Sequence, residues 1–249
     1  MQLGSQNANT APVITWCLIE IVQDPALFKA LRAEVQHVLE VDPRTGKRTL
    51  DYSKLANLPL LASVYAESMR LHVSVNITRL VEQDMKFDGF KLKKGALVQS
   101  PSGLGHLEHA HWSKPNHPAE QFWAERFIVH EEVKDNAGNT KTVPKFSASS
   151  HAGYFYPYGK YNQFKLSIFK TDANSNSGGG ASICAGRNFA KLEIMTSVAL
   201  FIINFDIEFI EYTHHDGTKS DRGPLDDPWW CGTAAMPPDR DLKIRWKRI

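Results

Sequence analysis

The sequence predicts a mixed α+β fold that is mainly α-helical, with small β-sheets. Apolar residues recur at helical spacing over residues 13–71 and again near residues 186–205. Elsewhere, short runs of β-type residues beside Asp-Gly, Gly and Pro predict strands and turns. The chain has 249 residues, 42% of them hydrophobic, which is enough to bury one core, alone or as part of a larger domain.

Charge and cysteine usage narrow the function classes. The formal net charge is +2 and no segment is a long run of one sign, so nucleic-acid binding is not expected. The three cysteines, Cys17, Cys184 and Cys231, form no close pair, which argues against a disulfide framework. One functional thiol and two structural thiols fit this pattern better.

No targeting or membrane-spanning segment is predicted. Residues 1–12 lack the basic and apolar regions of a signal peptide. The most apolar stretch, residues 194–205, is too short to cross a bilayer. The sequence as written is therefore expected to be soluble or peripheral to a membrane.

Three helices are expected in the first half of the chain. The first begins close to Met1, and its apolar positions follow helical spacing: Val13, Ile14, Leu18, Ile21 and Val22. The second opens at Asp24-Pro25, because aspartate is a good N-cap and proline at the first helical position loses no hydrogen bond. The third covers residues 59–71, while residues 42–50, with a proline and a glycine, are expected to form a loop.

The second half is expected to contain strands, loops and one more helix. Asp88-Gly89 between β-type residues is a strong hairpin signal, and a further strand is expected at residues 96–99. Residues 100–158 are rich in Pro, His, Ser and Gly and are expected to be irregular. A long helix is predicted over residues 186–205, followed by loops and a strand near the C-terminus.

Cys184 lies at the end of a glycine-rich stretch, Gly178-Gly-Gly-Ala-Ser-Ile-Cys184, and just before the last predicted helix. Glycines allow a backbone to approach a flat ligand closely. The N-terminus of a helix presents free N–H groups and the positive end of the helix dipole, which stabilise a thiolate, and a thiolate is a strong metal ligand. From residue types alone, a buried structural cysteine remains the alternative.

The arrangement G-x-x-x-C-x-G-R-x-F-A over residues 180–190 resembles the haem-binding loop of the cytochromes P450. The resemblance implies the C-terminal part of the P450 fold, with residues 1–249 forming one partial domain. It also implies haem (heme, iron protoporphyrin IX) as the cofactor and Cys184 as the thiolate ligand of its iron. In that family the thiolate favours O–O cleavage. Four further residues are implied around the haem: Gly180, Gly186, Arg187 and Phe189.

Two further motifs of the family occur in the expected order. Glu67-Ser-Met-Arg70 matches E-x-x-R, whose two side chains lie on one face of a helix. Residues 122–127 resemble the meander motif, with Ala124 in place of the usual proline. The resemblance implies that Arg126 joins Glu67 and Arg70 in a buried structural triad; an ordinary surface ion pair is the alternative for E-x-x-R.

One more arginine follows the E-x-x-R motif at a place where the family often binds a haem propionate. Arg79 has this position, and a guanidinium suits a carboxylate bidentately. A solvated strand residue is an equal alternative for this arginine.

The N-terminal helix is similar to the oxygen-side helix of the family. Its S-Q-x-x-N-T-x-P pattern resembles the branch of sterol 7α- and 12α-hydroxylases, prostacyclin synthase and their fungal relatives. The resemblance implies that Thr10 lies near bound dioxygen and that Asn9 replaces the acid usual there, so both are candidate catalytic residues. Asparagine cannot supply a proton as a carboxylate does, and some relatives with this change are isomerases.

The resemblance implies a haem-thiolate monooxygenase acting on a lipophilic small molecule such as a sterol, fatty acid or secondary metabolite. Its partners would be dioxygen and NADPH-cytochrome P450 reductase, and the full-length family resides at the endoplasmic reticulum membrane on its cytosolic face. One alternative is a haem-thiolate isomerase that needs no reductase. The other is an inactive truncated fragment that cannot hold haem, because the chain is about half the usual length and its haem loop is interrupted.

The interruption lies between Tyr156-Pro-Tyr158-Gly159 and Gly178. Relatives usually join these two parts directly, whereas here residues 160–177 intervene and resemble nothing in the family. We hypothesise that residues 160–177 are an insertion from an unspliced intron, because the codons for Gly-Lys-Tyr, Thr-Asp and Ser-Gly can contain donor, branch-point and acceptor consensus sequences.

Overall fold

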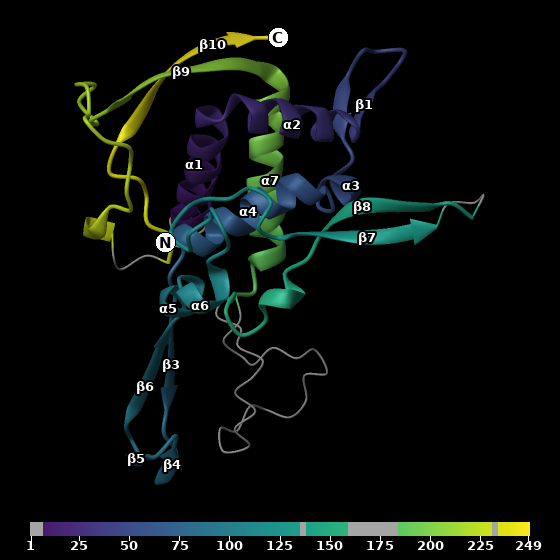
Figure 1. Cartoon of the computed structure of the whole chain (residues 1–249). Coiled ribbons are helices and arrows are strands. Elements are labelled where there is room, and N and C mark those ends of the chain that lie inside the picture. Colours follow the sequence, from purple (N-terminus) through teal and green to yellow (C-terminus); the bar gives the residue numbers. More distant parts are fainter. Residues whose placement is uncertain (1–6, 135–137, 159–183, 231–233) are drawn as a thin grey trace.

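The computed structural model describes residues 7–134, 138–158, 184–230 and 234–249. Helices and two-stranded antiparallel sheets follow one another along the chain (Figure 1). The α-helices are α1 (Asn7–Gln23), α2 (Pro25–Gln36), α3 (Tyr52–Leu55), α4 (Pro59–His72), α5 (Ser102–His106), α6 (His109–Trp112) and α7 (Arg187–Asn204), and the 3-10 helices are η1 (Ser149–His151) and η2 (Pro228–Trp230). This content agrees with the predicted α+β class.

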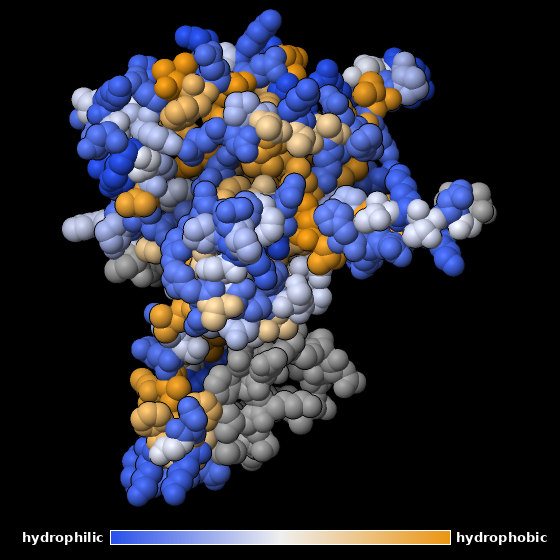
Figure 2. All heavy atoms as spheres, in the orientation of Figure 1, coloured by the Kyte–Doolittle hydropathy of each residue, from blue (hydrophilic) through white to orange (hydrophobic). Residues whose placement is uncertain are grey.

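The strands pair as five antiparallel ribbons within the described residues. These are β1 (Leu39–Val41) with β2 (Arg48–Leu50), β3 (Asn76–Leu80) with β6 (Leu97–Pro101), β4 (Met85–Phe87) with β5 (Phe90–Leu92), β7 (Ile128–Lys134) with β8 (Thr140–Phe146), and β9 (Phe205–Thr213) with β10 (Asp241–Arg248). The β3–β6 ribbon projects from the helical body and ends in the hydrophilic β4–β5 tip (Figures 1 and 2).

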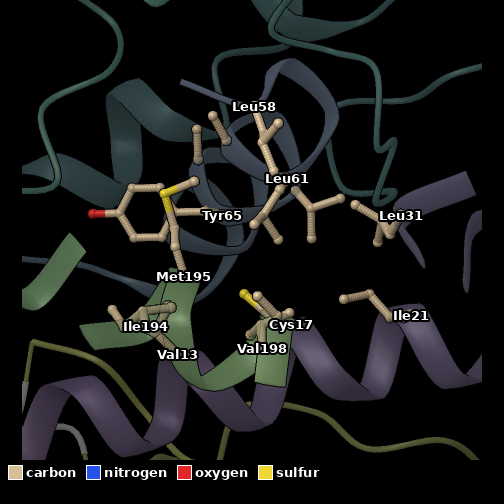
Figure 3. Packing of buried hydrophobic residues seen from close by; sticks show 14 of the residues in the cluster. Val13, Cys17, Ile21, Leu31, Leu58, Leu61, Tyr65, Ile194, Met195 and Val198 are labelled. Atoms are coloured by element: carbon tan, nitrogen blue, oxygen red, sulfur yellow. The ribbon is translucent and has the colours of Figure 1, made fainter. Parts of the chain in front are cut away.

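The core lies where α1, α2, α4 and α7 pack together. Apolar side chains from all four helices interdigitate there (Figure 3): Val13, Cys17, Ile21, Leu31, Leu61, Tyr65, Ile194, Met195 and Val198. Each fully buried aliphatic side chain contributes about 1.5–3 kcal/mol relative to an exposed one. Since α4 and α7 also border the candidate site, the core fixes the elements that build it.

The start of α2 forms as the sequence predicts. Asp24 accepts hydrogen bonds from the backbone N–H groups of Ala26 and Leu27, and Pro25 occupies the first helical position. The start of α4 depends instead on a distant residue, because Leu58 makes no side-chain cap. The Glu34 carboxylate of α2 accepts from the N–H groups of Leu60 and Leu61 at 2.8 and 2.9 Å, which satisfies two free donors of α4.

Arg32, two residues before Glu34 on α2, binds the end of α7. Arg32 donates to the carbonyls of Ile202 at 3.0 Å and Phe205 at 2.5 Å, and it pairs with Asp206. A cation suits the C-terminus of a helix, where carbonyls are free and the dipole is negative. Helix α2 therefore anchors α4 and α7, two of the helices that carry candidate site residues.

Several predicted elements are confirmed and others are wrong. Asp88 and Gly89 have φ values of 46° and 81° between paired Phe87 and Phe90, as a type I′ hairpin requires. Residues 42–50 are not one loop, because β2 pairs with β1 around a turn. Residues 100–158 are not irregular, because they contain α5, α6, β7 and β8, and β9 was not predicted. The predicted start of the first helix, close to Met1, lies outside the described residues.

Within the described part of the chain, no single helix is long and apolar enough to span a membrane. Helices α1 and α2 together reach that length and hydropathy, but their axes are bent by 115° at the break between them.

Candidate functional site

One cavity of about 910 Å³ brings together residues that lie far apart in the sequence. Its walls come from the start of α1, the junction of α4 with β3, Pro157–Tyr158, the start of α7 and Ala234–Ala235. Six residues that the sequence analysis named as candidate site residues line it: Asn9, Thr10, Arg79, Cys184, Gly186 and Phe189. A volume of this order suits a small-molecule ligand or cofactor.

Cys184 is an exposed, free thiol at the cavity, two residues before Gly186, the N-cap of α7. The Cys184 N–H donates to the Tyr158 carbonyl at 3.3 Å, so these two chain segments meet although 25 residues separate them in sequence. A Cβ built on Gly186 would lie 4.0 Å from the Cys184 sulfur. This is an ordinary van der Waals distance, so a side chain here would lie directly beside the thiol.

Two residues of the predicted haem loop lie outside the cavity lining or outside the described residues. Arg187 does not line the cavity; its guanidinium Nη1 donates to the Cys184 carbonyl at 3.2 Å. Gly180 lies outside the described residues, as does the predicted insertion over residues 160–177.

The first turn of α1 supplies another wall of the cavity. Thr10 is buried there, and Asn9 lies beside it with its side-chain oxygen accepting from the Ala235 N–H at 3.1 Å. Much of the remaining lining is apolar: Val13, Met69, Val73, Val75, Ile77, Phe189 and Ile194. Asn76, Thr78, Tyr158 and Glu193 add polar groups. A largely apolar cavity with one thiol suits a flat, lipophilic group with a metal centre, so the donor set fits a haem.

Arg79 reaches the same cavity from β3. Its side chain is half-buried, and its Nη1 donates to the Thr78 carbonyl at 2.9 Å. The rest of the guanidinium can pair with a carboxylate at the cavity wall.

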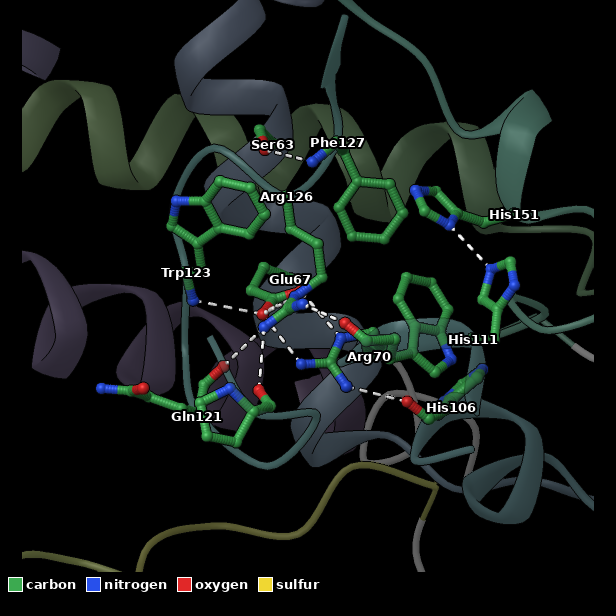
Figure 4. Close-up of polar contacts among 12 residues, drawn as sticks. Ser63, Glu67, Arg70, His106, His111, Gln121, Trp123, Arg126, Phe127 and His151 are labelled. Atoms are coloured by element: carbon green, nitrogen blue, oxygen red, sulfur yellow. Dashed lines mark hydrogen bonds and ion pairs between the residues drawn. The ribbon is translucent and has the colours of Figure 1, made fainter. Parts of the chain in front are cut away.

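Glu67, Arg70 and Arg126 lie together in the interior (Figure 4). Arg70 donates to both Glu67 oxygens at 2.8 Å, and Arg126 Nε donates to Glu67 Oε1 at 2.7 Å. The three side chains are at most 1% exposed. Because Glu67 and Arg70 are on α4, this triad joins α4 to the segment that carries Arg126.

Other donors of the two arginines bind backbone carbonyls. Arg70 Nη1 donates to the His106 carbonyl at 2.8 Å, and Arg126 Nη1 donates to the Trp112 carbonyl at 2.6 Å. Arg126 Nη2 donates to the carbonyls of Pro118 and Gln121. The triad therefore holds α5, α6 and the 118–127 segment on α4. Met69 of α4 and Val73, which follows the helix, line the cavity.

His106 of α5 binds two segments beside the cavity, and no sequence pattern predicted this role. Its side chain is fully buried, Nδ1 contacts the Val73 carbonyl at 3.0 Å, and the Tyr156 N–H donates to Nε2 at 3.1 Å. Burial lowers the pKa of His106 to about 4. Both contacts join residues 33 and 50 positions away, so only the folded chain shows them.

Tyr158 is a second residue that the sequence analysis did not single out. It lines the cavity, its carbonyl binds the Cys184 N–H, and its hydroxyl contacts the Tyr65 hydroxyl of α4. Burial raises the pKa of Tyr65 well above its ordinary value, so this phenol stays neutral. The contact connects the segment beside the thiol to the core.

These features define a class: an α+β protein with a free thiol at a helix N-terminus, facing an apolar cavity that is braced by a buried Glu-Arg-Arg triad. A family model described as cytochrome P450 matches residues 7–160. The chain therefore belongs to the cytochrome P450 family, whose members are haem enzymes.

Curated relatives agree with this assignment. The chain is 42% identical to cytochrome P450 monooxygenase calL of Penicillium decumbens, over 98% of this chain and 40% of the relative. It is 30% identical to cytochrome P450 monooxygenase efuG of Hormonema carpetanum, over 99% and 42%. It is 26% identical to 7-alpha-hydroxycholest-4-en-3-one 12-alpha-hydroxylase of Oryctolagus cuniculus, over 99% and 44%. The chain thus spans less than half of the length of these relatives, and the predicted resemblance to P450s of fungi and to sterol 12α-hydroxylases is confirmed.

Proposed function

We propose that this chain is the C-terminal, haem-binding part of a cytochrome P450 monooxygenase that acts on a lipophilic small molecule. Residues 1–249 would form one partial domain with the C-terminal part of the P450 fold. The observation that carries the proposal is the single cavity that Cys184, Thr10, Asn9, Arg79 and Phe189 share.

Each cavity residue has a role in this proposal. Cys184 would ligate the haem iron, and Gly186 leaves room beside the sulfur. Arg79 would pair with a haem propionate, and Phe189 would pack against the ring. Arg187 would support the ligand through its bond to the Cys184 carbonyl. Bound haem supplies the activation of dioxygen, which no side chain of the chain can provide.

Thr10 and Asn9 would act on the oxygen side of the cavity. The Thr10 hydroxyl can both donate and accept a hydrogen bond, so it can hold a proton near a bound ligand. The Asn9 amide can donate a hydrogen bond but cannot give up a proton at physiological pH. The remaining apolar walls would exclude water from the reacting group.

The proposed substrate class and partners are based on the cytochrome P450 relatives and on the residues that line the cavity. One relative is by name a 12-alpha-hydroxylase of a cholestenone, and the apolar walls of this cavity suit a sterol, fatty acid or secondary metabolite. Monooxygenation would require dioxygen and electrons from NADPH-cytochrome P450 reductase. The full-length enzyme would then work at the cytosolic face of the endoplasmic reticulum membrane.

Asn9 favours a second candidate, a haem-thiolate isomerase that consumes no external electrons, because an amide replaces the acid usual at this position. Oxidation of NADPH in the presence of reductase and substrate would support the monooxygenase and contradict the isomerase. A third outcome is a fragment that holds no haem, which the spectrum below would reveal.

The thiolate site makes a direct spectroscopic prediction. When the chain is loaded with haem, reduced and exposed to carbon monoxide, its Soret band should shift strongly to the red, as a thiolate ligand requires. Cys184→Ala should abolish that shifted band. The measurement is the reduced carbon monoxide difference spectrum of both proteins at equal haem loading.

Cys17→Ala is the matched control, because it removes the other described thiol. Cys17 is buried in the core, and burial raises its pKa to about 12, so it should not serve as a ligand. The shifted band should survive in this control. A band that persists in Cys184→Ala, or vanishes only in Cys17→Ala, would contradict the ligand assignment; no band in any variant would identify a fragment without haem.

The proposed insertion makes a second prediction. The Tyr158 carbonyl and the Cys184 N–H are 3.3 Å apart, which supports a short connection between them. A deletion of residues 160–177 should fold, retain more haem than the full chain and show a stronger shifted band. Loop entropy changes by only about 0.6 kcal/mol for each doubling of length, so stability should change little.

Haem content per chain and the thermal midpoint would be measured for the full and shortened chains. A shortened chain that loses haem relative to the full chain would contradict the insertion hypothesis. Substitution of Arg44 and Thr45, in the exposed turn between β1 and β2, offers a control for the effect of altering a surface loop.

A further inference from the structure

The segment Ala234–Met236, called here the C-terminal wall, forms one side of the cavity. Ala234 and Ala235 line it, and Val73 pairs with Ala235 in an antiparallel bridge. Two backbone bonds flank this bridge: the Ser74 N–H donates to the Ala234 carbonyl at 2.8 Å, and the Met236 N–H donates to the His72 carbonyl at 3.3 Å. The α4–β3 junction therefore holds the wall from one side.

Helix α1 holds the same wall from a second direction. Trp16 Nε1 donates to the Met236 carbonyl at 2.8 Å, and the Ala235 N–H donates to the Asn9 side-chain oxygen at 3.1 Å. The Ala235 N–H takes no part in the two bonds that flank the bridge, so its bond to Asn9 adds a separate attachment. Asn9 and Ala235 are 226 positions apart in the sequence.

We propose that Asn9 is a positioning residue that holds the C-terminal wall against α1 through its bond to Ala235. Its side-chain oxygen accepts the wall's N–H, which joins the first turn of α1 directly to Ala235. The residue therefore acts on the shape of the cavity through Ala235. The bond between Asn9 and Ala235 forms in the chain without haem. Any effect of this bond on which substrate fits the cavity rests on the proposed function.

Because Asn9 lies in the first turn of α1, its bond to Ala235 can be removed without weakening the helix. Asn9→Ala removes the acceptor, and alanine has the highest helix propensity, so the substitution should not weaken α1. Asn9→Asp keeps an acceptor oxygen in the same place, and a carboxylate is favourable at a helix N-terminus. The two variants therefore differ in the bond to Ala235 and agree in preserving the helix.

Hydrogen exchange of the backbone amides of the full 249-residue chain, measured without haem, tests the proposal. Loss of one hydrogen bond in Asn9→Ala should make the Ala235 amide exchange about five- to tenfold faster. Asn9→Asp should restore slow exchange. Asn57→Ala is the matched control, because the Asn57 side chain donates only to the nearby Ser53 carbonyl, and it should leave Ala235 unchanged.

Three results would overturn the proposal. The first is unchanged exchange of Ala235 in Asn9→Ala, and the second is exchange in Asn9→Asp as fast as in Asn9→Ala. The third is faster exchange throughout α4 and α7, which would mean that Asn9 supports general stability and not the wall. None of these readouts needs haem, so a failure to bind haem would reject the proposed function and leave this test intact.

Discussion

Glu67→Gln should lower the free energy of unfolding by about 3–5 kcal/mol, because it leaves two buried guanidinium groups without their carboxylate. Glu67 Oε1 accepts from Arg70, Arg126 and the Trp123 N–H, so an amide NH₂ placed there would face other donors. Such a loss is a large part of the 5–15 kcal/mol that stabilises an ordinary domain. Urea denaturation followed by circular dichroism would measure it.

Glu208→Gln is the matched control for this prediction. Glu208 pairs with Arg245 on the surface, where both side chains are more than half exposed, and a pair of this kind contributes at most about 1 kcal/mol. The control should therefore unfold close to the wild type. A Glu67→Gln protein whose unfolding midpoint matches that of Glu208→Gln would show that the triad does not stabilise the fold.

Acidification should remove about 3 kcal/mol of stability through His106 alone as the pH falls from 6.5 to 4. Burial lowers the pKa of His106 from 6.5 to about 4 in the folded chain. The unfolded chain therefore binds more protons in this window, so the stability is fully present above pH 6.5 and is lost as the pH falls toward 4. His151, whose pKa burial also lowers to about 4, acts in the same direction.

The physical cause lies in the two contacts of the His106 ring. The Tyr156 N–H donates to Nε2, which must therefore carry a lone pair, and Nδ1 must then donate to the Val73 carbonyl. Protonation of Nε2 would place its new N–H group directly opposite the Tyr156 N–H, and the hydrogen bond between them would be lost. It would also place a positive charge in the interior near Arg70.

His106→Gln tests this acid sensitivity, because glutamine can donate and accept but does not titrate. Its free energy of unfolding, measured by urea denaturation at several pH values, should fall less between pH 6.5 and 4 than that of the wild type. His130→Gln, on the exposed face of β7, should keep the wild-type slope. An equal slope in His106→Gln and wild type would assign the acid sensitivity to other groups.

Local chemistry made much of the fold predictable. The N-cap at Asp24 and the hairpin at Asp88-Gly89 depend on neighbouring residues, and the structure confirms both. The helices predicted at residues 59–71 and 186–205 also form, although side chains of α2 bind the start of α4 and the end of α7. The short helices α5 and α6 escaped prediction because tertiary contacts hold them. His106 of α5 is fixed by Val73 and Tyr156, and Trp112 of α6 is buried against the triad.

The sequence also indicated the candidate ligand, through resemblance to a family. The position of Cys184 before a helix and its surrounding glycines suit a metal-binding thiolate but left a buried structural cysteine open. The resemblance of this loop, and of the E-x-x-R and meander motifs, to the cytochromes P450 implied haem-thiolate chemistry. Only the tertiary structure decided what surrounds the thiol. Asn9, Arg79 and Ala235 reach one cavity from distant segments, and Asn9 binds a wall that its neighbours in the sequence do not indicate. Contacts of this kind depend on how helices pack, and packing is set by the whole core at once.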